Sequence, residues 1–202
     1  YISDTATNDA SISWVATGQS SLTVTIINRV ATISATANWY GSEEITFIAT
    51  DNDGINPMSG SDAATFTANQ VNDAPVFSSS AITSATEDAA YSYTATGSDV
   101  DAGDVLTFAA TTLPTWLTLN INTGVLSGTP TNDNVGNHSV VLTVSDGEGG
   151  SAEQSFTISV ANTNDAPVFS TPTNTSNEDE AFSSTITATD VDVGDVLTFA
   201  AI

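Results

Sequence analysis

Apolar side chains recur along the chain in short runs, which is the pattern of half-buried β-strands. Residues 22–26, 45–48, 140–144 and 156–160 alternate with period two or stay apolar over the length of one strand. Turn-forming residues, such as the Asn-Thr-Gly of residues 122–124, separate these runs. No stretch keeps a 3.6-residue apolar period over three turns. The pattern therefore predicts an all-β protein.

The sequence also repeats itself, with a period of about 92 residues. Asn-Asp-Ala-Pro-Val-Phe occurs at residues 72–77 and again at 164–169, and Gly-Asp-Val-Leu-Thr-Phe-Ala-Ala occurs at 103–110 and 194–201. Residues 38–41 align more weakly with 133–136, which relates the first part of the chain to the second. The repeats predict three modules: residues 1–70, truncated at the N-terminus; residues 71–162, complete; and residues 163–202, the N-terminal part of a third.

Seven short strands in the complete module, with turn signals every 8–12 residues, are typical of a Greek-key β-sandwich. We therefore expect tandem seven-stranded sandwiches arranged end to end. In such a module one alternating set of side chains fills the core. The set predicted for residues 71–162 is Tyr93, Leu106, Phe108, Trp116, Leu117, Leu119, Val125, Val140, Leu142, Val144, Phe156, Ile158 and Val160.

The charge of the chain is strongly unbalanced, because it has 24 acidic residues and only one Lys or Arg, Arg29. The net charge is −23 at pH 7, yet hydrophobic residues make up 40% of the sequence, so the chain is expected to fold. A single cation disfavours nucleic acid and anionic membranes as partners. No apolar run reaches 18 residues, so we expect no membrane insertion in this segment. Cysteine is absent, which excludes disulfides and thiolate metal sites.

On this strand assignment the acidic residues fall at strand ends, and therefore at the two poles of each sandwich. Asp99, Asp101 and Asp146 lie at the pole that faces the preceding module. Glu87, Asp133, Asn164 and Asp165 lie at the pole that faces the following one. Carboxylates that converge without Lys or Arg need an external cation, and Ca²⁺ takes 6–8 oxygen ligands in flexible geometry. Zinc would need imidazole or thiolate, and the chain has one His.

The Asp-Val-Asp of residues 99–101, the Asn-Thr-Gly of 122–124, the Ser-Asp of 145–146 and the Asn-Asp-Ala-Pro-Val-Phe of 164–169 together resemble a cadherin repeat. The resemblance is greatest to the dystroglycan-type cadherin-like domains of large bacterial surface proteins. The first module resembles the related Ig-like/cadherin-like repeats. The resemblance implies calcium ligands at two junctions: Asn72 and Asp73 with Asp99, Asp101 and Asp146, and Glu87, Asp133, Asn164 and Asp165 with Asp190 and Asp192.

The sequence departs from the cadherin pattern in ways that imply fewer ions at each junction. The leading acid of the cadherin linker is replaced by Gln70 and Asn162, and the acidic triplet before the sixth strand is reduced to Asp133. Asp104 and Asp195 are interpreted as strand starts. Four further acids in the first module, Asp4, Asp9, Asp51 and Asp53, are weaker candidates for calcium.

These observations predict a calcium-binding extracellular stalk, adhesin or surface-filament component, whose partners are neighbouring repeats, other copies of itself or glycans. The alternative is a carbohydrate-binding module, which requires an exposed aromatic platform; Trp14 and Trp39 are its candidates, while Trp116 is expected in the core. An enzyme is not expected. His138 is the only histidine, and the acidic groups repeat with the module, whereas an active site rarely does.

Overall fold

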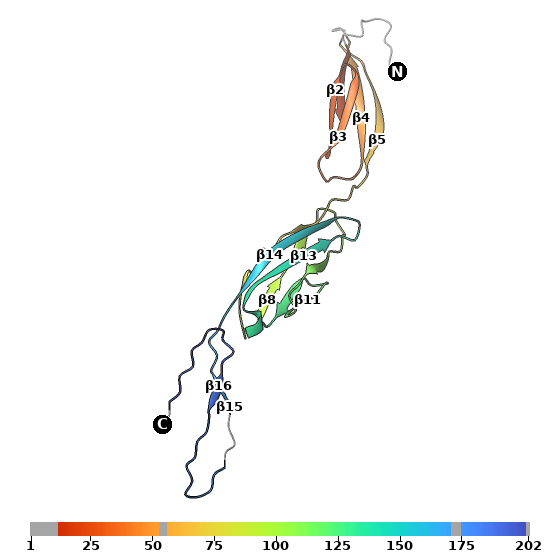
Figure 1. Cartoon of the computed structure of the whole chain (residues 1–202). Coiled ribbons are helices and arrows are strands. Elements are labelled where there is room, and N and C mark those ends of the chain that lie inside the picture. Colours follow the sequence, from red (N-terminus) through yellow and green to blue (C-terminus); the bar gives the residue numbers. More distant parts are fainter. Residues whose placement is uncertain (1–11, 53–55, 171–174, 201–202) are drawn as a thin grey trace. The chain divides into compact units, whose positions relative to one another are not determined.

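The structure is a computed structural model that describes residues 12–52, 56–170 and 175–200. The chain forms two compact units, Tyr1–Asn72 and Asp73–Ile202 (Figure 1). Apart from one 3-10 turn, Asn132–Asn134, the regular elements of the described residues are strands. Within those residues no helix has the length and apolarity needed to cross a bilayer.

In the second unit, residues 73–161 form a sandwich of two main sheets. One sheet has the strand order β10-β13-β14-β7, in which β7 lies parallel to β14, and the other has the order β11-β12-β8. A short third pair joins β6 to β9. The bounds are β6 Val76–Phe77, β7 Ser84–Thr86, β8 Tyr91–Thr94, β9 Gly97–Ser98, β10 Thr107–Thr112, β11 Leu117–Leu119, β12 Val125–Gly128, β13 Gly136–Ser145 and β14 Ser151–Ala161.

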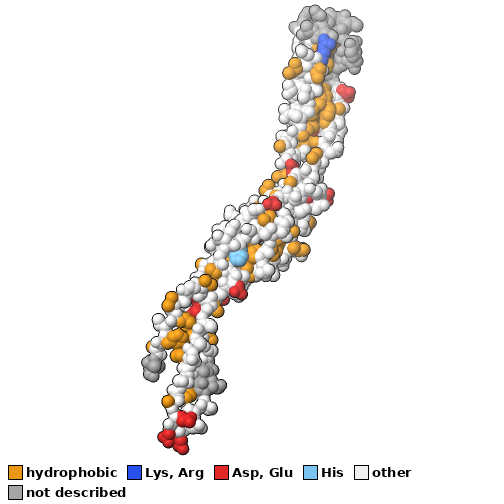
Figure 2. All heavy atoms as spheres, in the orientation of Figure 1, with side chains coloured by type: hydrophobic (Ala, Val, Ile, Leu, Met, Phe, Trp, Pro, Cys, Tyr) orange, Lys and Arg blue, Asp and Glu red, His pale blue; other side chains and the backbone are white. Residues whose placement is uncertain are grey.

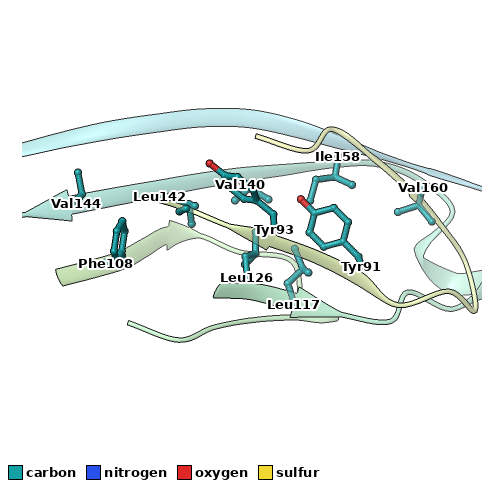
Figure 3. Close-up of a cluster of buried hydrophobic side chains, with 11 residues drawn as sticks. Tyr91, Tyr93, Phe108, Leu117, Leu126, Val140, Leu142, Val144, Ile158 and Val160 are labelled. Carbon is teal, nitrogen blue, oxygen red and sulfur yellow. The ribbon is translucent and has the colours of Figure 1, made fainter. Parts of the chain in front are cut away.

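The core of this sandwich lies between the two sheets, where alternate residues of each strand point inward (Figure 3). Val140, Leu142 and Val144 project from β13, and all three are fully buried. They meet Leu126 of β12, also fully buried, and Tyr93 of β8. The period-two burial follows directly from the alternation that the sequence shows.

The predicted core set agrees with this cluster in most positions. Eight of its members are buried, and Leu106, Trp116, Leu119 and Phe156 pack against them while partly buried. On β12, however, the fully buried residue is Leu126, and Val125 is only half-buried. Because Val125 and Leu126 are adjacent and both apolar, the sequence of this four-residue strand does not determine which of the two faces the core. Tyr91 and Ala95 are also buried, although the sequence analysis did not include them.

The first unit holds a smaller set of strands. β4 Gly41–Asp51 lies between β1 Ile12–Thr17 and β5 Ser59–Ala68, antiparallel to both. β2 Leu22–Ile27 and β3 Val30–Ala35 form a separate hairpin. Its buried apolar side chains among the described residues are Leu22, Ile45 and Ala49, far fewer than in the second unit.

The described residues between 163 and 200 belong to the second unit, and their regular structure is one strand pair, β15 Val168–Ser170 with β16 Thr187–Thr189. β15 holds the second copy of the sequence that forms β6, so this segment is the counterpart of the opening part of residues 73–161. The prediction of an all-β protein built from β-sandwich domains is confirmed.

Candidate metal centres

Asp146 follows β13 directly, and its carboxylate is held by the loop of residues 146–150. Oδ1 accepts hydrogen bonds from the backbone N–H groups of Glu148, Gly149 and Gly150 at 2.8, 3.0 and 3.0 Å. Gly150 is required here, because a Cβ at this position would lie 2.1 Å from Oδ2 of Asp146. The side chain is 4% exposed. The turn thus fixes a buried carboxylate at one pole of the sandwich.

Two further carboxylates converge on Asp146. Asp99, Asp104 and Asp146 each offer an oxygen, and these oxygens lie within 4.8 Å of one another. Oδ2 of Asp99 and Oδ2 of Asp104 are buried and have no hydrogen-bond partner among the described residues. Burial, followed by the charges of Asp99, Asp101 and Asp146, raises the pKa of the Asp104 carboxyl above its ordinary value.

The linker before the sandwich is attached to this pole. Oδ2 of Asp101 accepts a hydrogen bond of 2.6 Å from the backbone N–H of Asp73, and the N–H of Asp101 donates to Oδ1 of Asp99 at 3.0 Å. Asp101 is 7% exposed. Asn72, which was predicted as a ligand with this set, belongs to the first unit.

A second cluster joins Glu87, Asp165 and Asp192, whose carboxylate oxygens also lie within 4.8 Å of one another. Glu87, in the turn after β7, is 1% exposed. Its Oε1 accepts a hydrogen bond from the backbone N–H of Thr163, while its Oε2 is buried without a partner among the described residues. Oδ2 of Asp165 accepts from the amide of Asn132 at 2.8 Å. One buried carboxylate oxygen of this cluster's residues therefore has no donor among the described residues.

The hydrogen bonds of the first pole recur at the second. The N–H of Asp165 donates to Oδ2 of Asp192 at 2.6 Å, as that of Asp73 does to Asp101. The N–H of Asp192 donates to Oδ1 of Asp190 at 3.0 Å, as that of Asp101 does to Asp99. Asp190, Asp192 and Asp195 form a third group of converging carboxylates. The repeated sequence therefore repeats the local geometry.

Of the eleven residues predicted as ligands, six belong to these groups of converging oxygens: Glu87, Asp99, Asp146, Asp165, Asp190 and Asp192. Asp73 and Asp101 are hydrogen-bonded beside them. Asp133 is exposed and lies in none of the three groups, and Asn164 is exposed as well. Asp133 is on the 3-10 turn, where its neighbour Asn132 makes the contact to Asp165, and the amide of Asn164 donates to the backbone carbonyl of Asp165.

The sequence analysis did not place Asp104 and Asp195 among the ligands, although both converge with predicted ones. A signal for them was present, because Asp195 repeats Asp104 at the same spacing at which Asp190 repeats Asp99. Of the weaker candidates, Asp51 ends β4, whereas Asp4, Asp9 and Asp53 lie outside the described residues.

The donor set is the kind that hard divalent cations prefer, because every ligand atom is a carboxylate oxygen. Residues 73–202 contain neither Lys nor Arg, so no basic side chain of this unit can neutralise the clusters. Leaving buried carboxylate oxygens without a donor or a cation is costly. The orphaned oxygens of Glu87, Asp99 and Asp104 therefore fit a bound cation at each pole.

The tryptophans bear on the alternative function, a carbohydrate-binding module. Trp14, Trp39 and Trp116 are all partly buried. Trp116 packs edge-on between Tyr91 and His138, with ring centroids 5.8 and 5.9 Å away. Each tryptophan is therefore only partly accessible to a ligand.

The family described as "Putative Ig domain" (He_PIG) matches residues 74–161, the complete sandwich. The protocadherin GammaB4 extracellular domain is similar in structure, with a TM-score of 0.55 and 23% identity over 91% of this chain and 35% of its own. Extracellular cadherin domains 3–6 of protocadherin Gamma B2 give a TM-score of 0.56 and 20% identity over 91% of this chain and 53% of theirs. The domains are Ig-like and cadherin-like in fold.

These likenesses concern the fold alone, since the identities are low. An endo-fucoidan hydrolase of glycoside hydrolase family 107 is 29% identical over 76% of this chain and 24% of its own, but a TM-score of 0.40 does not establish a shared fold. The chain spans about half or less of each of these proteins. No curated protein matches the chain.

Proposed function

We propose that the chain is a calcium-binding segment of an extracellular repeat protein, in which the ions stiffen the junctions between sandwich domains. The observation that carries this proposal is the cluster of Glu87, Asp165 and Asp192. Glu87 is 1% exposed, and its Oε2 has no hydrogen-bond partner among the described residues. A buried carboxylate that converges with two others and keeps one oxygen without a donor is the kind of group that a cation ligand supplies.

Calcium suits the clusters better than other common cations. It accepts carboxylates and carbonyls in irregular geometry, whereas Mg²⁺ demands a small octahedron and Zn²⁺ prefers nitrogen and sulfur. The resemblance to cadherin repeats implies the same ion. With three carboxylates in each group, the remaining ligands would be other protein oxygens and water.

A cation at the second cluster would connect three parts of the second unit. Glu87 belongs to the complete sandwich, Asp165 to the linker and Asp192 to the segment that follows. Neutralising these carboxylates removes a repulsion that no Lys or Arg of the unit offsets, so calcium is expected to order the linker. This is how the chain would serve as a stiff stalk.

The proposed setting is the cell surface. Ig-like and cadherin-like domains are typical of extracellular proteins, and the finer resemblance to bacterial cadherin-like repeats suggests an adhesin or a surface filament. In this role the chain is not an enzyme, and its partners are neighbouring repeats or further copies. Carbohydrate binding is less well supported, because all three tryptophans are partly buried.

Calorimetric titration with calcium tests the proposal. It compares the parent chain with the variants E87Q and D192N and with the control variant E153Q. Glu153 is an exposed residue of β14 outside the three groups, so E153Q is expected to bind like the parent chain. E87Q removes a charge from the Glu87 group, and D192N removes one from both groups that contain Asp192, so each is expected to abolish or weaken binding at this pole. A free calcium concentration 100 times Kd would stabilise the domain by about 2.7 kcal/mol, measurable as a rise in melting temperature.

Small-angle scattering provides the functional readout. EDTA is expected to shorten the maximum dimension of the parent chain, because repelling junctions bend more freely than clamped ones. Unchanged scattering would contradict the stalk. Titrations that show no calcium binding, or show that E153Q and E87Q bind alike, would contradict the metal sites.

A further inference from the structure

Asn132 brings a neutral side chain to the Glu87–Asp165–Asp192 cluster, although the sequence analysis did not include it. It opens the 3-10 turn before β13, and its Nδ2 donates a hydrogen bond of 2.8 Å to Oδ2 of Asp165. An ionised carboxylate only accepts hydrogen bonds, so the NH2 end of the amide must face it. Both side chains are partly buried. The bond joins the complete sandwich to the linker that follows β14.

The turn that carries Asn132 is fixed by hydrogen bonds of its own. The N–H and the hydroxyl of Thr131 donate to Oδ1 of Asn134 at 2.9 and 3.1 Å, and the N–H of Asn134 donates to the carbonyl of Thr131 at 2.8 Å. Nε2 of His138 lies 2.6 Å from the carbonyl oxygen of Asn134, and the His138 ring packs edge-on against Trp116. The position of Asn132 is therefore set by contacts that its own side chain does not make.

The same turn is bonded to the segment that carries Glu87. The N–H of Asp88 donates to the carbonyl of Pro130 at 2.8 Å, and the N–H of Glu87 donates to the carbonyl of Ala161 at 3.1 Å. Pro130 is fully buried, as is the side chain of Glu87. Glu87 and Asn132 therefore meet the linker from one body, the pole of the complete sandwich.

Neutral amides orient the carboxylates of this cluster, because the unit has no basic side chain. Residues 73–202 contain no Lys or Arg, and the visible face of the second unit in Figure 2 shows acidic side chains with no basic ones beside them. Oδ1 of Asp192 accepts from the amide of Asn162 at 3.0 Å. Asn162 directly follows β14 and belongs to the linker, whereas Asn132 donates to Asp165 from the sandwich itself.

A donor on one oxygen of Asp165 restrains the whole carboxylate group. Both oxygens can accept, so Oδ2 can keep its bond to Asn132 while Oδ1 binds a cation. Hydrogen bonds of this kind orient metal ligands, and their removal typically lowers metal affinity about 10–100-fold. Because the linker carboxylate is already oriented, less conformational entropy is lost when an ion binds.

We propose that Asn132 is a positioning residue of this metal centre, which holds the Asp165 carboxylate against the sandwich before a cation arrives. The inference rests on the proposed calcium function and adds to it a residue that is not itself a ligand. It also gives this turn a different role from the one that the cadherin resemblance implies. That resemblance placed a ligand at Asp133, which is exposed, whereas the neighbouring Asn132 makes the contact.

Calorimetric titration with calcium tests the proposal on the 202-residue chain carrying N132A. The backbone carbonyl of Asn132 keeps its bond from the N–H of Val135, so the turn is expected to remain folded. The affinity at the Glu87 pole should fall about 10-fold with the number of bound ions unchanged. N137A is the matched control, because Asn137 is an exposed amide of β13 and its removal should leave the affinity unchanged. Binding at the Asp146 pole serves as the internal control.

Melting temperatures in EDTA and in calcium separate positioning from a purely structural role. A hydrogen bond that only stabilises the fold would, when lost, lower the melting temperature of the second unit equally in both buffers. A positioning residue acts on binding, so the calcium-induced rise in melting temperature should be smaller in N132A than in the parent chain and in N137A. Equal shifts in both buffers would overturn the proposal.

Exchange of the side-chain amide protons, measured by NMR, shows whether Asn132 still donates when calcium is bound. Its protons should exchange with water more slowly than those of Asn137, with and without calcium. Rapid exchange in calcium would show that the amide has turned its oxygen toward the ion, and the positioning role would be wrong.

The proposed function can stand when this inference fails. A parent chain that binds calcium while N132A binds it with the same affinity would overturn the role of Asn132 and leave the metal centres intact. A parent chain that binds no calcium would overturn both. The two failures are therefore distinguishable.

Discussion

At the scale of single residues, the poles of the second unit place carboxylates where they repel one another. Asp104 is partly buried, and its Oδ2 has no hydrogen-bond partner among the described residues. Burial and four neighbouring carboxylates raise its pKa, which means that the charged form is disfavoured in the calcium-free protein. The Asp104 carboxylate is therefore expected to lower the stability of the calcium-free protein and to raise the stability of the calcium-bound protein.

The variant D104N is therefore expected to change stability and binding in opposite directions. Without calcium it removes repulsion and should raise the melting temperature of the second unit. With calcium it removes a charged ligand, so the affinity and the calcium-induced rise in melting temperature should fall. Calorimetry in EDTA and in calcium measures both, with E153Q as the control. Equal shifts in both buffers would show that Asp104 is not a ligand.

A second carboxylate, Glu43 of β4, is fully satisfied by hydrogen bonds. It accepts from the hydroxyl of Ser20 at 2.5 Å and from the backbone N–H groups of Ser20, Ser21 and Leu22 at 3.0, 2.7 and 3.2 Å. These bonds, the Ser20 hydroxyl first, lower the pKa of Glu43 from 4.5 to about 2. The carboxylate thereby ties the start of β2 to β4.

The pH dependence of the first unit follows from this depressed pKa. The folded state holds the ionised form, so the contribution of Glu43 is complete above pH 4.5 and is lost as the pH falls toward 2. E43Q should therefore lower the stability of this unit at neutral pH and flatten its loss between pH 4.5 and 2. The exposed neighbour Glu44 provides the control E44Q. Chemical denaturation at several pH values measures the difference, and identical profiles for E43Q and the parent chain would contradict it.

At the scale of elements, β13 and β14 determine the architecture of the complete sandwich. Ten residue pairs join them, from Gly136–Val160 to Ser145–Ser151. β13 supplies three fully buried side chains, and both ends of this pair adjoin an acidic cluster. The ladder therefore fixes the core and also sets the distance between the two poles. In the first unit the corresponding strand, β4, has Ile45 and Ala49 as its buried apolar residues.

The two units should consequently unfold separately. I45A and L142A each remove a fully buried side chain and are expected to destabilise their own unit by about 2–5 kcal/mol. Differential scanning calorimetry should show two transitions, the lower one moved by I45A and the higher one by L142A and by EDTA. A single transition that both substitutions move equally would contradict separate unfolding.

At the scale of the whole molecule, electrostatics acts on the contacts between consecutive domains. The acidic clusters lie at the poles of one sandwich, where a cation would join consecutive domains of a chain. Residues 73–202 contain no Lys or Arg that could take the place of this cation. A stalk whose junctions are stiffened by bound cations is the arrangement that these clusters favour.

The sequence by itself was sufficient to predict the fold class, the repeat and the position of the acidic residues at the ends of the sandwich. Period-two alternation and recurring motifs are local properties of the chain, so they can be recognised without the structure. It also predicted most members of the clusters. Asp99 and Asp146, for example, follow predicted strands that end at the same pole, and their carboxylate oxygens converge. It did not determine that Leu126 rather than Val125 faces the core, or that Asp104 joins Asp99 while Asp133 stays exposed. Those outcomes depend on strand register and on the path of each turn, which are set by contacts between residues far apart in the chain. Only the tertiary structure could therefore decide which carboxylate oxygens meet and which are left without a donor.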